Sequence, residues 1–238
     1  MSVLTLQLAG PLQSWGASAR FARRTTEFAP TKSGVLGLLA AAQGRDRRAD
    51  LSDLAALRFG VRIDQPGTRI RDYQTAHHGD TGKSMPVSER FYLADAVFVA
   101  AVEGNAALIH ALHAAVREPV YLPYLGRRSC PPARPVDLDI HPEAHLEDVL
   151  KTERWHASPW YQRRRRREAL VPLDLITETE AGDALGDSLR DQPLSFDPRH
   201  RRHGLRTVRS QTVEVPNPLA MTAAAAVDHD PTLLLDGA

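Results

Sequence analysis

Arginine side chains interleaved with aromatic rings are the residues of this chain best suited to holding a phosphorylated ligand. The segment 21–29 places Arg23 and Arg24 between two phenylalanines. Guanidinium groups bind phosphate bidentately and stack on flat rings, while aromatic rings stack on bases. Residues 1–34 hold one acidic side chain, Glu27, against four basic ones, which are Arg20, Arg23, Arg24 and Lys32, a net charge of +3. This pattern indicates an anion-binding surface with phosphate as the expected guest.

A second polar group follows the first apolar stretch. Residues 3–8 alternate with the period of a half-buried strand, which ends at the turn signal Gly10-Pro11. Gln13, Ser14 and Trp15 come next. We expect this strand to deliver an amide, a hydroxyl and an indole to a flat, polar ligand. The alternative is that Trp15 closes one end of the core.

A helix is expected over residues 33–43, directly after this polar segment. Either Thr31 or Ser33 can cap its N-terminus. Lys32 and the free amides of the first turn would then face an approaching anion. This helix start is the second place where the sequence predicts phosphate binding.

Residues 69–90 are typical of a β-hairpin that extends out of the domain, with its tip at 77–85. Tyr73 offers a stacking face, and Arg71 and Arg90 offer phosphate contacts. The alternative is a solvated hairpin on a charged surface.

A glycine-containing basic loop occupies residues 121–130. Gly126 permits close backbone approach, and Arg127 and Arg128 supply charge. These arginines could instead pair with acidic groups in a subunit interface.

Four segments of the chain resemble, in order and spacing, motifs of one protein family. They are Leu12–Gly16, Pro30–Gly34, Arg71–Thr75 and Tyr124–Pro132. The chain resembles the Cas-five family (RAMP superfamily), a subunit of the type I-E CRISPR surveillance complex, Cascade. The resemblance extends to about residue 135, and no residue after it is assigned by this likeness.

The resemblance implies a non-catalytic subunit that holds the 5′ handle of the CRISPR RNA (crRNA) and caps the backbone of the complex for antiviral defence. The implied partners are the crRNA, the adjacent backbone subunit and the large subunit, with target DNA reached indirectly through the complex. No catalytic residue, cofactor or metal is expected. The expected RNA-binding residues are Gln13, Ser14, Trp15, Arg20, Arg23, Arg24, Lys32, Ser33, Arg71, Tyr73, Gln74, Arg90, Arg127, Arg128 and Ser129.

Two other functions remain open from the sequence. The first is a metal-independent endoribonuclease that cuts CRISPR repeat RNA, for which Tyr73, His77, His78 and Lys83 could supply an acid and a base. The second is a protein scaffold without RNA contact. The ten histidines show no specific metal-ligand spacing.

The order strand, helix, strand, long excursion, strand, helix predicts an α+β fold of the ferredoxin-like, RRM-type (RAMP) class. We expect a palm domain over 1–68 and 91–215, an inserted hairpin, the thumb, over 69–90, and a C-terminal tail over 216–238 that is flexible or a docking arm. The expected strands are 3–8, 59–63, 91–102, 120–125, 136–140, 170–177 and 207–215. The expected helices are 33–43, 51–57, 106–116 and 146–157.

Composition indicates a protein of the cytoplasm. The 238 residues are 42% hydrophobic, contain one cysteine, and lack any apolar run near the ~18 residues of a membrane span. The start of the chain does not resemble a secretory signal. Net charge is only +1, because an acidic segment at 174–197 offsets the arginines. Five consecutive arginines, 163–167, indicate a solvated turn or a docking point for an acidic partner, with Trp155, Trp160 and Tyr161 as interface anchors.

Overall fold

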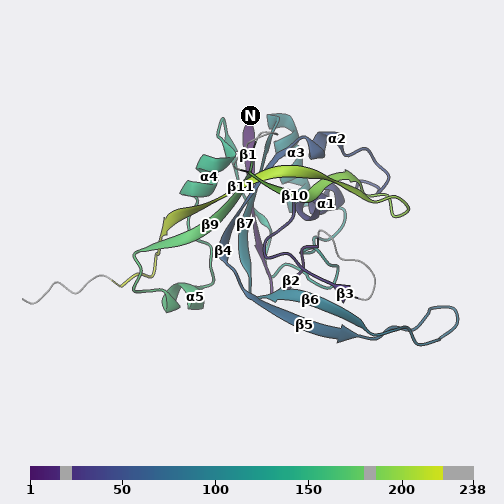
Figure 1. The fold of residues 1–238 in the computed structure, drawn as a ribbon. Coiled ribbons are helices and arrows are strands. Elements are labelled where there is room, and N and C mark those ends of the chain that lie inside the picture. The colour runs from purple at the N-terminus through teal and green to yellow at the C-terminus, as the bar shows by residue number, and fades with distance from the viewer. Residues whose placement is uncertain (17–22, 180–185, 222–238) are drawn as a thin grey trace, which may run out of the picture.

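The computed structural model describes residues 1–16, 23–179 and 186–221, which form a mixed α/β fold with mostly antiparallel sheets (Figure 1). The large sheet contains β1 (Ser2–Ala9), β4 (Arg58–Gln65), β7 (Val97–Gly104), β8 (Asp137–Pro142), β9 (Leu170–Glu178), β10 (Asp187–Ser195) and β11 (Arg202–Pro216). The small sheet contains β2 (Leu12–Gln13), β3 (Arg23–Arg24), β5 (Thr68–Gln74) and β6 (Ser88–Ala94). The helices are α1 (Lys32–Ala42), α2 (Ser52–Ala55), α3 (Ala106–Arg117), α4 (Leu146–Thr152) and α5 (Pro159–Arg164).

The large sheet has the order β10-β11-β9-β4-β7-β1-β8, and every pairing within it is antiparallel. Strand β1 lies between β7 and β8, so the first strand of the chain is central. Helices α1 and α3 cover one face and α4 covers the other, which buries every residue of β1 and β7 (Figure 1). The prediction that β1 is half-buried was wrong because both of its faces are covered.

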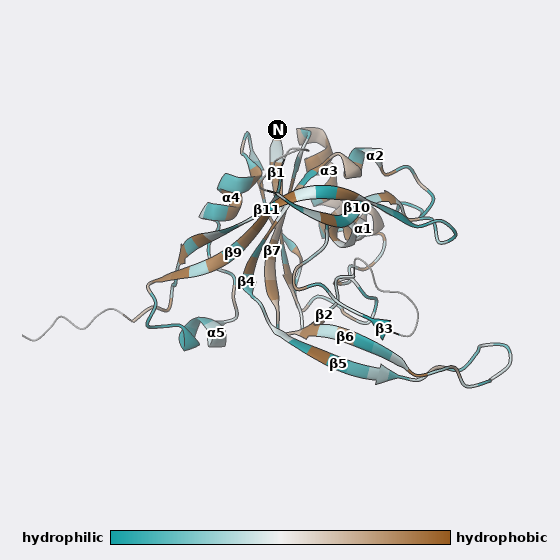
Figure 2. Cartoon of the chain, in the orientation of Figure 1, coloured by the Kyte–Doolittle hydropathy of each residue, from teal (hydrophilic) through white to brown (hydrophobic). Residues whose placement is uncertain are grey.

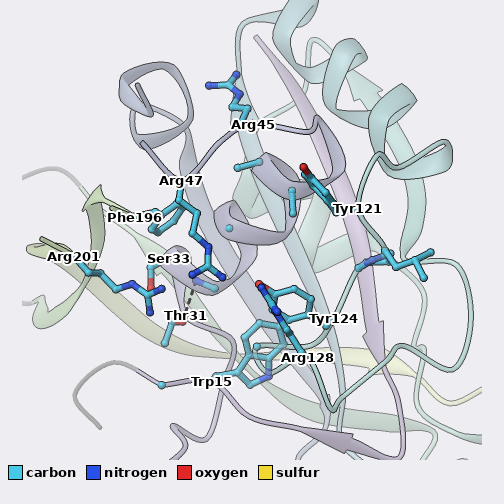
Figure 3. Close-up of a pocket in the computed structure, with 18 of the residues that line it drawn as sticks. Trp15, Thr31, Ser33, Arg45, Arg47, Tyr121, Tyr124, Arg128, Phe196 and Arg201 are labelled. Carbon is cyan, nitrogen blue, oxygen red and sulfur yellow. Dashed lines mark hydrogen bonds between the residues drawn. The ribbon is translucent and has the colours of Figure 1, made fainter. Parts of the chain in front are cut away.

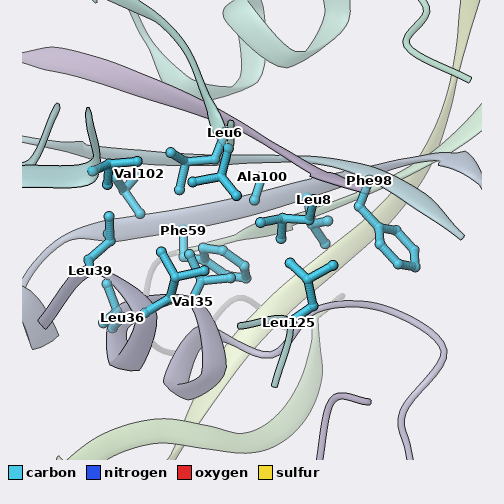
Figure 4. Packing of buried hydrophobic residues seen from close by; sticks show 14 of the residues in the cluster. Leu6, Leu8, Val35, Leu36, Leu39, Phe59, Phe98, Ala100, Val102 and Leu125 are labelled. Atoms are coloured by element: carbon cyan, nitrogen blue, oxygen red, sulfur yellow. The ribbon is translucent and has the colours of Figure 1, made fainter. Parts of the chain in front are cut away.

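The main core lies between the sheet and helices α1 and α3 (Figure 4). Leu6 and Leu8 of β1 pack there with Leu36 and Leu39 of α1 and with Phe59 of β4. A second cluster lies under α4 on the opposite face. Apolar residues accordingly concentrate in the central strands, whereas hydrophilic residues predominate along β5 (Figure 2).

A long β-hairpin leaves the body of the molecule, formed by β5 and β6 (Figure 1). The predicted strand 91–102 is in fact two strands: β6 belongs to the hairpin and β7 to the large sheet. Asp95, with a φ of 55°, breaks the run between them. On the other arm, Gly67 has a φ of +72°, and a Cβ there would lie 2.5 Å from the Ala94 carbonyl oxygen. The bend therefore needs glycine at this point.

Other elements also differ from expectation. Residues 120–125 form no strand, because Pro123 lies within a largely exposed loop. The helix expected over 146–157 ends at Thr152. Strand β10 was not predicted, since it is an edge strand with register shifts and an interior Pro193, which obscure its alternation.

Candidate nucleic-acid interface

Gln13, Ser14 and Trp15 form part of the core and do not present polar groups to a ligand. The Gln13 amide donates to the carbonyl oxygens of Leu8, at 3.0 Å, and Ala96, at 2.8 Å. Its own oxygen accepts from the Trp15 indole at 3.0 Å. The Ser14 hydroxyl donates to the Phe91 carbonyl at 3.1 Å. The expectation that this segment is displayed at a strand end was wrong, and the alternative, Trp15 closing the core, describes the structure.

The start of helix α1 is already occupied by a carboxylate of the protein itself. The Lys32 amide donates to Oδ2 of Asp191 on β10 at 2.8 Å, while the Thr31 hydroxyl accepts from the Gly34 amide. The same Asp191 accepts two bonds from Arg206 of β11, at 2.6 and 3.0 Å. The predicted phosphate site at this helix start is therefore filled by Asp191.

Lys32 does not face the solvent, contrary to the prediction. Its side chain is buried, and its ammonium group pairs with Glu178 of β9 at 2.9 Å. Burial lowers the pKa of Lys32, and the neighbouring Glu178 carboxylate opposes that shift. Ser33 is also buried. Lys32 connects α1 to Glu178 of β9 and Asp191 of β10 and leaves no free charge at the helix start.

One face of the β5–β6 hairpin, which we call the hairpin face, carries stacked arginines and aromatic rings: Arg23, Arg69, Arg71, Tyr73 and Phe91. The register aligns Arg71 with Phe91 and Tyr73 with Glu89, while β3 pairs alongside β6. The guanidiniums of Arg23 and Arg69 lie 5.4 and 5.3 Å from the centre of the Phe91 ring. That of Arg71 lies 4.9 Å from the Tyr73 ring. The stacking holds these cations flat while their edges remain free for phosphate.

The hairpin face is open to solvent. Tyr73 is 56% exposed, and Phe28, on which Arg69 also stacks, is 67% exposed. Large aromatic rings with this exposure are suited to stacking on unpaired bases. Gln74 lies at the end of β5 with its amide bonded to Asp72 at 2.8 Å.

Arg127 connects the glycine-containing loop to this hairpin. Its guanidinium lies over the Tyr92 ring at 4.7 Å and donates to the Arg24 carbonyl at 2.9 Å. Two buried guanidinium nitrogens, Nη1 of Arg127 and Nε of Arg90, have no hydrogen-bond partner among the described residues. Arg128 and Ser129 are exposed. Buried donors without partners are costly, so a ligand that accepted bonds from them would be favoured.

Gly126 has a structural reason for being glycine. Its φ is +82°, and a Cβ at this position would lie only 1.8 Å from the Ser14 carbonyl oxygen. The loop also pairs with the strand end through the bond from the Ser14 amide to the Leu125 carbonyl at 3.1 Å. Close approach to the chain itself, not to a ligand, therefore explains this glycine.

A groove of about 820 Å³ lies over helix α1, between the 121–128 loop and the tip of the β10–β11 hairpin (Figure 3). We call it the α1 groove. Small residues of α1 form its floor, and Tyr121, Tyr124 and Phe196 line its sides. Arg47 and Arg201 extend toward the Ser33 end of the helix, whereas Arg45 turns away, where it pairs with Asp53 (Figure 3).

The groove is electropositive. Arg47, Arg128 and Arg201 line it against one carboxylate, that of Asp46. Burial lowers the pKa of His203, which also lines the groove, and the nearby Arg201 charge lowers it further. His203 is thus a neutral group there at pH 7 and becomes a further cation only in acid.

The structure brings Arg23, Arg71 and Tyr73 together on the hairpin face, and Arg24, Arg90 and Arg127 behind it. Arg128 lies apart, in the α1 groove. Arg20 lies outside the described residues. Six residues of these surfaces were not among the RNA-binding residues predicted from the sequence. They are Phe28, Arg47, Arg69, Phe91, Phe196 and Arg201. The spacing of Arg69 two residues before Arg71 and four before Tyr73 is the signal that could have found Arg69, since alternate strand residues share a face.

Neither a metal centre nor a membrane span is found in the part of the chain that the structure describes. No group of three or more His, Cys, Asp or Glu side chains there is placed to hold a metal ion. No helix among residues 1–16, 23–179 and 186–221 is long and apolar enough to cross a membrane.

Most of the chain matches known proteins. Residues 3–209 match the family described as CRISPR-associated protein (Cas5). The CRISPR system Cascade subunit CasD of Escherichia coli (strain K12) is 39% identical over 158 residues, covering 58% of this chain and 70% of that protein.

Two solved structures share both sequence and fold. A crystal structure of a Cas protein is 38% identical with a TM-score of 0.69, covering 92% of this chain and 97% of that one. A chain of a CRISPR RNA-guided surveillance complex is 34% identical with a TM-score of 0.71, covering 98% of both chains. With the family match over residues 3–209, this likeness shows that the chain belongs to the CRISPR-associated Cas5 family.

Proposed function

We propose that this chain is the non-catalytic RNA-binding subunit of a type I-E CRISPR surveillance complex in the cytoplasm. It holds the 5′ handle of the crRNA and caps the backbone of the complex for antiviral defence. The likeness to the Cascade subunit CasD and to a chain of an RNA-guided surveillance complex supports this assignment. The single observation that carries it is the hairpin face, where three arginines stack on aromatic rings at an exposed surface.

The topology supports a ferredoxin-like RAMP palm. Within the large sheet the order β8-β1-β7-β4 combines two strand–helix–strand units, β1–α1–β4 and β7–α3–β8, into one antiparallel sheet. We assign residues 1–68 and 91–215 to the palm and 69–90 to the thumb. The tail, 216–238, begins where β11 ends, at Pro216.

The hairpin face suits single-stranded RNA better than a duplex. Exposed rings of Phe28 and Tyr73 give platforms on which unpaired bases stack, worth about 1–3 kcal/mol per base. A guanidinium lies over each platform, Arg69 over Phe28 and Arg71 over Tyr73, and Arg23 adds a third charge over Phe91. Phosphate contacts then supply affinity, and the 2′-hydroxyl and base edges supply selectivity.

Exposed apolar residues support the expected protein partners. Met85 and Val87 are 48% and 53% exposed beside the hairpin tip, and Tyr121 and Leu122 are 59% and 83% exposed at the rim of the α1 groove. Large apolar side chains in such positions are typical of subunit contacts. We assign the hairpin tip to the adjacent backbone subunit and the 120–122 loop to the large subunit, through which target DNA is reached.

The test is to co-express the tagged chain with the other subunits of its complex and to sequence the RNA that co-purifies. We expect uniform RNAs that begin with a repeat-derived handle. A variant with Arg23→Gln, Arg69→Gln and Arg71→Gln should retain at least tenfold less RNA. The matched control carries Arg48→Gln, Arg117→Gln and Arg134→Gln, the same loss of charge at exposed positions outside the interface, and should retain RNA.

Two outcomes would count against the proposal. Equal RNA retention by the hairpin-face variant and the wild-type chain would remove the hairpin face as the RNA-binding surface. A discrete cut product from repeat RNA incubated with the pure protein in EDTA would favour the endoribonuclease instead. In that case substitution of Tyr73, His77, His78 or Lys83 should abolish the cut.

A further inference from the structure

Helix α5 ends in a turn of five arginines, 163–167, which we call the arginine turn. Arg165 is engaged within the protein, since its guanidinium donates to Glu168 at 2.9 Å. The other four, Arg163, Arg164, Arg166 and Arg167, are exposed. None of them makes an ion pair or lies over an aromatic ring within the described parts of the chain. Four uncompensated cations thus occupy five consecutive positions.

The backbone beneath these charges is fixed. The buried Asn217 donates from its side-chain amide to the carbonyl oxygens of Gln162 and Arg165, at 3.2 and 3.0 Å. The Met221 amide donates to the Arg166 carbonyl at 2.7 Å. These bonds hold the turn against the end of β11. In Figure 1, α5 lies at the outer edge of the molecule, beside the start of β9. The arginines therefore project from a defined place and not from a mobile loop.

A cavity of about 460 Å³ joins the arginine turn to the hairpin face. Arg69 of β5 and Phe28, on which Arg69 stacks, line it on one side, and Tyr161 of α5 and Arg165 just after α5 line it on the other. Asp64 and Asp174 also line this cavity, and the Asp64 carboxylate is paired with Arg62. The positive surface of the hairpin thus continues toward the arginine turn, with Asp174 as an opposing charge on the way.

We propose that the arginine turn is a second nucleic-acid surface, which binds the phosphate backbone of duplex DNA without reading its sequence. Duplex DNA presents one negative charge per ~1.7 Å of axis, which a dense cluster of cations can match. The hairpin face offers rings for bases, whereas the four free arginines have none beneath them, so they are suited to a duplex whose bases stay stacked.

This inference goes beyond the proposed function, because RNA binding at the hairpin face does not require the arginine turn. It also predicts a direct contact with DNA, where the sequence resemblance implied an indirect one. The two surfaces can be separated by substitution, since no residue of the arginine turn is among the hairpin-face arginines. Failure of one assignment therefore leaves the other testable.

The test is fluorescence anisotropy of the purified full-length protein with a labelled 30-base-pair duplex of random sequence over a series of salt concentrations. Substitution of Arg163, Arg164, Arg166 and Arg167 by glutamine should weaken duplex binding at least tenfold at low salt. Each lost phosphate contact lowers the slope of log K against log salt by about 0.9, so four contacts lower it by about 3–4. Binding of single-stranded handle RNA should stay within about twofold.

Two further variants serve as controls. Lysine at the same four positions keeps the charge and should retain duplex binding and most of the salt slope. The variant with Arg48→Gln, Arg117→Gln, Arg134→Gln and Lys151→Gln removes the same charge from exposed sites elsewhere and should bind the duplex like the wild-type chain. Thermal melting of every variant checks that the fold is kept.

Three results would overturn the proposal. The first is a wild-type chain that does not bind the duplex at low salt. The second is a glutamine variant with unchanged affinity and slope, or an equal loss in the charge-matched control. The third is a glutamine variant that binds the duplex normally but no longer co-purifies with the other subunits, which would identify the arginine turn as a docking point for an acidic protein.

Discussion

Asp191→Asn tests whether one buried carboxylate holds the β10–β11 hairpin over helix α1. Asp191 is 2% exposed and Arg206 is 8% exposed. The carboxylate accepts two bonds from Arg206 and one from the Lys32 amide, so it joins β10, β11 and the start of α1. Asparagine removes the charge but keeps the size. It leaves the Arg206 guanidinium buried without its counter-ion and points an amide group at one of the donors.

Removing one partner of a buried ion pair costs about 3–5 kcal/mol. The upper part of this range applies only if Arg206 stays buried, because a hairpin that lifts would let its guanidinium reach water. For a chain of this size the loss corresponds to a decrease in Tm of roughly 6–20 °C. A lifted β10–β11 hairpin would also move Phe196 and Arg201 out of the α1 groove.

Circular dichroism recorded during thermal and denaturant unfolding would measure the loss of stability. The matched control is Asp187→Asn on the exposed part of the same strand, which should change stability by less than about 0.5 kcal/mol. The double variant Asp191→Leu with Arg206→Met removes both charges. Its loss of unfolding free energy should be smaller than the sum of the losses for Asp191→Leu alone and Arg206→Met alone. The reasoning is refuted if Asp191→Asn is as stable as the control, or if the double variant shows full additivity.

Two other predictions follow from single residues. Gly126→Ala should lower stability by about 2–6 kcal/mol, because a Cβ there meets the Ser14 carbonyl at a φ of +82°; Gly79→Ala, where a Cβ meets nothing within 4 Å, should be nearly neutral in the same melting assay. The pKa of His203 is lowered in the folded state. As pH falls through about 6.5, the ordinary histidine value, the unfolded chain therefore binds more protons than the folded chain, and stability falls until the folded pKa is passed. His203→Gln should lose this part of the pH dependence of Tm, and a variant that keeps the whole dependence would contradict the assignment.

Local patterns in the sequence were sufficient for the elements with strong periodicity. The first strand, helices α1 and α3, and the arms of the thumb follow from alternation or from helical spacing within one segment. The β-hairpin arms also place Arg69, Arg71 and Tyr73 on one face, because the strand period is two. The family likeness added the function, and the comparison with CasD and the surveillance-complex chain agrees with it.

Contacts between distant segments were not available from the sequence, and they changed the interpretation of single residues. Lys32 looks like a free cation at a helix start, but Asp191, 159 residues away in the chain, takes the helix amide, and Glu178 takes the ammonium group. Gln13 looks like a ligand-binding amide, but the Leu8 and Ala96 carbonyls need its donors.

The sequence by itself thus determined the strands and helices with strong periodicity and showed that arginines and aromatics occur together, because both depend on residues close in the chain. Only the tertiary structure decided which of those polar groups remain free. A buried cation must find a partner or lose its charge, and strands β9 and β10 supply such partners, Glu178 for Lys32 and Asp191 for Arg206. Among the residues that the structure describes, the arginines of the hairpin face and four of those in the arginine turn make no ion pair, and the two nucleic-acid surfaces proposed above are built on them.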